Sequence, residues 1–117
     1  MLYYNVALGA RRVSLVYRQL SVLKKTMIDI KTVISTVQKR LERGSVGIGI
    51  ELKTYKRDRG ITIVKVTDDH LLIREDGFVK NEFEIPVEKL KKTLRSLLKK
   101  EFPRSKKVWL SEKRLSG

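Results

Sequence analysis

The spacing of apolar residues changes twice along the chain, from helical to strand-like and back. Apolar side chains recur every three or four positions before residue 44, alternate with polar ones through residue 85, and return to helical spacing after Pro86. A period near 3.6 indicates a helix with one buried face, and a period of two indicates a half-buried strand. The pattern therefore predicts helices at both ends of the chain and strands between them.

Two helical stripes precede the strands. The second runs from Ile30 to Leu41, where Asp29 suits the N-cap and Gly44 suits the position just past the helix end. The first predicts a helix over residues 11–26, with the apolar members Val13, Val16, Tyr17, Leu20, Leu23 and Met27. The pattern is compatible with one bent helix or with two separate helices.

Four strands with short turns occupy the middle of the chain. They are expected at 46–53, 61–66, 71–74 and 78–85, and Asp76-Gly77 is the strongest hairpin signal between them. Parallel neighbours would need long crossovers, so these short turns predict an antiparallel meander.

A C-terminal helix is expected to begin near Pro86 and to end before Pro103. Proline is favoured at the first position of a helix and is disfavoured in its interior. Its apolar stripe consists of Val87, Leu90, Leu94, Leu97, Leu98 and Phe102. Residues 103–117 are predicted to be a basic C-terminal extension. In this extension Val108-Trp109-Leu110 either adds an edge strand or docks on the core.

The predicted fold class is α+β, as a single domain over residues 1–117 with the order α-β-β-β-β-α. The four-stranded antiparallel meander would be covered on one face by the N-terminal helix or helices and by the C-terminal helix, because a one-faced sheet must bury its apolar side. Residues 1–26 are expected to be a peripheral basic helix.

The four strands followed by Ile85-Pro86-Val87-Glu88-Lys89-Leu90 resemble, at the level of pattern, the coactivator/whirly class of single-strand DNA-binding proteins. The resemblance covers about residues 47–101 and rests on strand order and alternation, without a signature motif. Small SH3-like barrels share the same strand rhythm, and no binding residue is transferred from the resemblance.

The net charge of +14 is concentrated in the two terminal segments. Residues 1–44 carry nine Lys/Arg against two carboxylates, residues 45–85 carry seven against eight, and residues 86–117 carry eleven against three. Self-repulsion of this size destabilises a compact state unless a polyanion offsets it. The charge favours a nucleic-acid partner bound through phosphates by the terminal segments. RNA is preferred over DNA, because no major-groove recognition helix is recognisable.

The candidate nucleic-acid-binding residues come from four segments. On the C-terminal helix no acid lies between Lys89 and Lys100, whereas exposed helix faces ordinarily intersperse acids for pairing. The set comprises Lys89, Lys92, Arg95, Lys99 and Lys100 of that helix, Arg104, Lys106 and Lys107 of the extension, Lys56, Arg57 and Arg59 of a hairpin tip, and Arg11, Arg12 and Arg18 near the N-terminus. Trp109 either covers the open side of the core or stacks on an unpaired base.

We predict no enzymatic chemistry. The chain has no Cys and one His, which argues against disulfides, thiolate catalysis and Cys/His metal sites. Asp68-Asp69-His70 is interpreted as turn chemistry rather than a metal or acid–base cluster. We therefore expect no catalytic residue, cofactor, metal site or small-molecule substrate.

Two other functions fit the sequence. The chain is either a protein-interaction module or homodimer that packs through the Val13 to Met27 stripe, or a peripheral protein whose basic helices bind anionic lipid. No run approaches the ~20 apolar residues of a membrane-spanning helix, so integral membrane association is not expected. Two Asn, two Gln and many Lys and Glu match proteins from hot environments, and the expected location is the cytoplasm.

Overall fold

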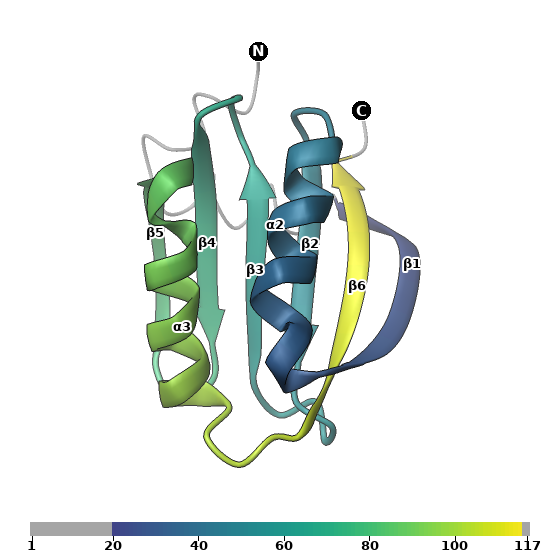
Figure 1. Cartoon of the computed structure of the whole chain (residues 1–117), viewed down its shortest axis with the longest axis vertical. Coiled ribbons are helices and arrows are strands. Elements are labelled where there is room, and N and C mark those ends of the chain that lie inside the picture. Colours follow the sequence, from purple (N-terminus) through teal and green to yellow (C-terminus); the bar gives the residue numbers. More distant parts are fainter. Residues whose placement is uncertain (1–19, 116–117) are drawn as a thin grey trace.

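The structure contains one antiparallel sheet with two α-helices on one of its faces (Figure 1). The computed structural model describes residues 20–115. The elements are β1 (Leu20–Asp29), η2 (Ile30–Thr32), α2 (Val33–Arg43), β2 (Ile48–Lys53), β3 (Gly60–Lys65), β4 (His70–Asp76), β5 (Lys80–Pro86), η3 (Val87–Lys89), α3 (Leu90–Glu101) and β6 (Lys107–Leu115). The α+β class and the antiparallel sheet are confirmed, whereas the prediction of four strands is wrong because the sheet has six. The predicted order α-β-β-β-β-α is also wrong, because a strand precedes α2 and another follows α3.

The strands are arranged in the order β1-β6-β2-β3-β4-β5. Strands β2 to β5 form the predicted meander, and each begins and ends within two residues of the expected position. Strand β6 lies between β1 and β2, so that Leu110 is opposite Thr26 on one side and Leu52 on the other. Strand β1 was not predicted, and β6 was predicted only as an edge strand, as one of two alternatives for residues 108–110.

The predicted helix over residues 11–26 is wrong where the structure describes it, because residues 20–29 form β1. Residues 11–19 lie outside the described part of the chain. The pairing of β1 with β6 shifts between Val22 and Lys24, as in a β-bulge. An extra residue in a strand breaks the period of two. The spacing of apolar residues there consequently resembles a helical one.

The predicted extension over residues 103–117 also needs correction, because residues 107–115 form an interior strand rather than an edge strand or a docked segment. Val108 and Leu110 are fully buried. Two charged residues of this strand have partners on neighbouring elements: Glu112 pairs with Arg40 of α2, and Lys113 Nζ lies 3.1 Å from Glu51 Oε1.

The helices α2 and α3 lie on the same face of the sheet, as predicted (Figure 1). Alternate residues of every strand from β2 to β6 contribute to the core beneath them, and the fully buried members include Val37, Ile50, Leu52, Ile63 and Ile73. Burial of this apolar surface is the main stabilising contribution to the fold. Neither α-helix of the described residues is long and apolar enough to cross a membrane.

The predicted helix ends are close to the observed ones. Asp29 is the N-cap of η2, and its carboxylate accepts a hydrogen bond from the Lys31 N–H at 2.8 Å. Helix α2 ends at Arg43, and the following Gly44 is extended rather than left-handed. Helix α3 begins at Leu90 rather than at Pro86, because Val87–Lys89 form a 3₁₀ turn.

Candidate nucleic-acid interface

Two of the predicted basic groups lie at the same end of the sheet. The β2–β3 hairpin tip carries Lys56, Arg57 and Arg59, and the α3–β6 connection leads to that end as well (Figure 1). The connection contributes Arg104, Lys106 and Lys107. Residues of both segments line one open hollow of ≈ 640 Å³, together with Met27 of β1. We call these six cationic residues the basic end.

The backbone of the α3–β6 connection is fixed against the rest of the fold. Phe102 is buried after the last residue of α3, and its N–H donates to the Leu98 carbonyl at 2.8 Å. The Lys106 carbonyl accepts a hydrogen bond from the Ile30 N–H at 2.8 Å. The next residue, Lys107, is opposite Asp29 in the sheet. The three cations of the connection therefore project from an anchored backbone.

The β2–β3 hairpin tip is also a closed, hydrogen-bonded turn. The Arg57 N–H donates to the Thr54 carbonyl at 2.9 Å, and the Thr54 N–H donates to the Arg59 carbonyl at 3.1 Å. The Thr54 hydroxyl donates to Asp58 Oδ1 at 2.6 Å, and this bond lowers the pKa of the Asp58 carboxyl. Arg57 has a φ of 62°, in the left-handed region that few non-glycine residues adopt.

Three aromatic side chains accompany these cations. Lys25 Nζ lies 5.0 Å from the centroid of the Trp109 ring, and Arg57 Cζ lies 5.1 Å from it. Arg59 Cζ lies 5.5 Å from the centroid of the Phe78 ring. These distances are typical of cation–π contacts. The third aromatic residue, Tyr55, is 71% exposed at the hairpin tip.

The basic end has little local charge compensation. None of its six cations forms an ion pair with a carboxylate among the described residues. Asp58 is the one acid among the described residues that line the hollow, and it is hydrogen-bonded to Thr54. The result is a concentration of positive charge around a concave surface, which raises the local concentration of anions.

A second hollow of ≈ 210 Å³ adjoins the hairpin tip on the sheet face opposite the helices. Its lining contains both cations and carboxylates, and some of them pair with residues of neighbouring strands. Lys113 pairs with Glu51 at 3.1 Å, and Lys80 approaches Asp76 to 4.0 Å. Five cations and three carboxylates line this hollow, so its charge is more compensated than that of the larger hollow, where four cations accompany Asp58. Arg57 and Arg59 of the basic end line this second hollow rather than the larger one. Its lining residues are Glu51, Lys53, Arg57, Asp58, Arg59, Gly60, Thr62, Arg74, Asp76 and Lys113.

The remaining predicted residues are divided between different places. Lys89, Lys92, Arg95 and Lys99 are exposed on the outer side of α3, and we call them the α3 stripe. Lys100 instead has a structural partner, because its Nζ lies 2.9 Å from Oε2 of the buried Glu75. Arg11, Arg12 and Arg18 lie outside the described residues.

Sequence reasoning missed a buried carboxyl pair, Glu75 and Glu101, beneath the β4–β5 turn. Burial raises the pKa of Glu75, and its hydrogen bond with Glu101 acts in the same direction. Burial opposes ionisation of Glu101 too, but hydrogen bonds from Glu75 and from the N–H groups of Phe78 and Val79 outweigh it and lower the pKa of Glu101. The sequence did contain a signal for this pair, because each glutamate occupies a position that continues the buried apolar stripe of its strand or helix.

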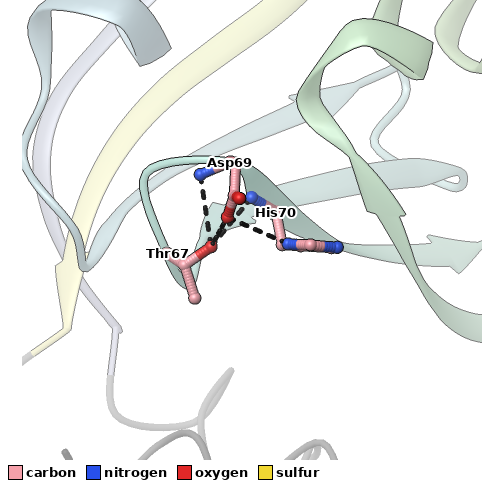
Figure 2. Close-up of polar contacts among 3 residues, drawn as sticks. All are labelled: Thr67, Asp69 and His70. Atoms are coloured by element: carbon pink, nitrogen blue, oxygen red, sulfur yellow. Dashed lines mark hydrogen bonds and ion pairs between the residues drawn. The ribbon is translucent and has the colours of Figure 1, made fainter.

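The His70 region has the geometry of a turn, as Figure 2 shows. The Thr67 hydroxyl oxygen accepts hydrogen bonds from the backbone N–H groups of Asp69 and His70, and the hydroxyl donates to Asp69 Oδ1 at 2.7 Å. The same Oδ1 lies 3.0 Å from His70 Nδ1. Bonds from Thr67 and His70 lower the pKa of Asp69. Because the hydroxyl is directed to Asp69 rather than to the imidazole, this arrangement does not activate Thr67 as a nucleophile.

No group of three or more His, Asp or Glu side chains suited to a metal ion occurs among residues described by the structure. Comparisons with protein-family models, with curated proteins and with solved structures found no match for the chain.

Proposed function

We propose that this protein is a non-enzymatic nucleic-acid-binding protein that contacts the phosphate backbone through the basic end. The observation that carries the proposal is the convergence of the hairpin tip and the α3–β6 connection on one hollow. Residues 56 and 106 are distant in sequence, yet Lys56 and Lys106 line the same concave surface. A polyanion that bridges the two segments would neutralise both at once.

Phosphate contacts suit this surface better than a small acidic ligand does. Each Lys or Arg that neutralises a phosphate releases condensed counterions, which gives affinity with little sequence preference. None of the six cations forms an ion pair within 4.0 Å among the described residues, so no such pair must be broken before a phosphate binds. Lys56 and Arg59 interact with Asp58 at longer range. Arg also matches the phosphate group geometrically, since its planar guanidinium donates two parallel hydrogen bonds.

RNA is the preferred partner in this proposal. A recessed surface formed by turns accommodates an irregular, unpaired strand more readily than a straight duplex, and sequence-selective RNA recognition commonly targets loops and single strands. Helix α3 packs its apolar side on the sheet, and its exposed side includes the α3 stripe.

Two variants of matched charge test the proposal. The first combines Arg104→Gln, Lys106→Gln and Lys107→Gln at the basic end, and the second combines Lys89→Gln, Lys92→Gln and Arg95→Gln on the α3 stripe. Each removes one Arg and two Lys. Affinity for a fluorescein-labelled single-stranded RNA is measured by anisotropy over a series of salt concentrations.

The basic-end variant is expected to bind more weakly, and its slope of log K against log[salt] should be shallower by about 2. The α3-stripe variant should retain a slope close to that of the natural sequence. Equal losses in the two variants would show that only overall charge matters. Absence of binding by the unaltered protein at low salt would refute the proposed function.

A further inference from the structure

We infer that the basic end binds unpaired bases as well as phosphates, so that its ligand is a single-stranded stretch of RNA in which bases stack on Tyr55 and on the Arg57–Trp109 pair. This inference rests on the proposed function and specifies the class of nucleic acid. It follows from where the structure places its aromatic side chains, not from the charge alone.

Among residues 25–114, the exposed large apolar side chains lie at two hairpin tips. Tyr55 is 71% exposed at the β2–β3 tip, and Phe78 and Val79 are 77% and 39% exposed at the β4–β5 tip. Arg59 connects the tips, because its guanidinium lies over the Phe78 ring and donates to the Glu101 carbonyl at 3.2 Å. Exposed aromatic rings beside cations are the common element of surfaces that bind single strands.

Trp109 provides a second aromatic position next to the hairpin tip. Its ring is half-buried on the sheet face opposite the helices, and Lys25 and Arg57 approach it from β1 and from the tip. A guanidinium plane held near an indole offers an extended flat surface. Such a surface accepts any base, because every base has a π-face.

The backbone of Arg57 supports a functional role for this side chain. A φ of 62° is easily adopted by Gly and is unfavourable for Arg. The turn itself needs no arginine, since the hydrogen bonds that close it come from the backbone and from Thr54 and Asp58. Strained residues of this kind concentrate at binding sites. The residue that adopts this unfavourable φ is thus the one whose guanidinium lies over the Trp109 ring.

An anionic lipid surface fits these contacts less well. Insertion of Phe78 into hydrocarbon would carry the guanidinium of Arg59 with it, because Arg59 is held over the ring and tied to the Glu101 carbonyl. Burying that charge in a bilayer is costly. A base that stacks on an exposed ring or on a guanidinium leaves the cation free to bind a phosphate.

The test compares Tyr55→Ala with Tyr55→Phe on ligands that differ in bases, sugar or strandedness. The ligands are a U-rich RNA strand, the corresponding DNA strand, an abasic strand of equal length and a duplex RNA, each of about twelve nucleotides. Tyr55→Ala is expected to weaken binding of the base-containing RNA strand by roughly 5- to 100-fold. It should leave binding of the abasic strand unchanged, and Tyr55→Phe should behave like the natural protein.

Arg57→Gly separates binding from stability. Its melting temperature is expected to be equal to or above that of the natural protein, because Gly relieves the unfavourable φ, while affinity for the RNA strand falls at least several-fold. The chain has one Trp, so quenching of its fluorescence by the RNA strand, and not by the abasic strand, reports stacking at Trp109 directly.

The failures of the two proposals can be told apart. Equal affinity for abasic, duplex and base-containing strands, with no effect of Tyr55→Ala, would overturn the inference and leave phosphate binding standing. Tighter binding of the DNA strand than of the RNA strand would overturn RNA as the ligand. Binding to anionic vesicles but to none of the strands would overturn both proposals.

Discussion

The carboxylate of Glu101 accepts a hydrogen bond from the backbone N–H of Phe78 at 2.7 Å, so that the last residue of α3 holds the turn between β4 and β5. Its second oxygen accepts the Val79 N–H at 3.2 Å. The side chain is buried, and its removal would leave both donors without these partners. We predict that Glu101→Ala lowers the free energy of unfolding by about 2–4 kcal/mol.

Urea denaturation measures this loss, with Glu88→Ala as the control. Glu88 is exposed in the turn that precedes the same helix, and its replacement should change stability by less than about 0.5 kcal/mol. A similar small effect of both substitutions would mean that the Glu101 contacts do not hold the turn.

The pKa of Glu75 leads to a prediction about pH. Its pKa is raised by burial from the ordinary Glu value of 4.5, so the folded protein retains a proton that the unfolded chain gives up. Between these two pKa values the free energy of unfolding therefore falls as the pH rises. Glu75→Gln keeps a donor toward Glu101 and has no proton to lose. The variant should gain stability relative to the natural protein as the pH rises above about 4.5.

Chemical denaturation of both proteins at several pH values from about 4.5 upward checks the prediction. The titration of Glu101 is present in both proteins, so it largely cancels in the comparison. If the free energy of unfolding changed with pH in the same way in both proteins, Glu75 would ionise as freely in the folded protein as in the unfolded chain.

The interior position of β6 predicts a large effect of a conservative truncation. Leu110 is fully buried between β1 and β2, under the helices. Leu110→Ala should reduce stability by about 2–5 kcal/mol, through lost burial and the cavity that remains. Val79→Ala, at an exposed position, serves as the control. Were residues 103–117 an extension beside the core, the two substitutions would have similar, small effects.

Lys65 is expected to stabilise the end of α2. Its Nζ donates to the carbonyls of Leu41 and Gly44, each at 3.0 Å. Helix C-termini leave carbonyls without partners within the helix and favour a nearby cation. Lys65→Met should lower the free energy of unfolding by about 1–2 kcal/mol, and the melting temperature should fall accordingly. Lys80→Met on β5, where the side chain is 84% exposed, should have little effect in the same thermal scan.

The elements that could be predicted from the sequence are those whose pattern depends on neighbours in the chain. Helix α2, helix α3 and the β2–β5 meander combine regular spacing with turn residues such as Asp76-Gly77. Strand β1 was not predictable, because a register shift between Val22 and Lys24 obscures its alternation. A strand at Val108-Trp109-Leu110 was one of two predicted alternatives, but the interior place and the length of β6 were not predictable because its charged residues Glu112 and Lys113 have their partners on α2 and β2.

The candidate site was predictable in composition but not in arrangement. The sequence contains the cations of the hairpin tip and of the α3–β6 connection in separate segments, and nothing local indicates that they share a surface. Their proximity depends on β6 lying beside β2, which is a long-range pairing. For the same reason the contact of Arg57 with Trp109 was not foreseeable, although each residue was singled out separately.

The place of β6 in the sheet also determines the order in which the fold can be completed. The only strand that pairs with β1 is β6, and their register joins Leu20 to Leu115 across nearly the whole described chain. Contacts this distant in sequence close a large loop and slow folding. During synthesis the β2–β5 meander can form early, because its strands are close in sequence. Strand β1 has no pairing partner among the described strands until residues 107–115 have left the ribosome. The two strands that complete the sheet are thus the last to be joined, and the concave surface at the basic end cannot exist before they are.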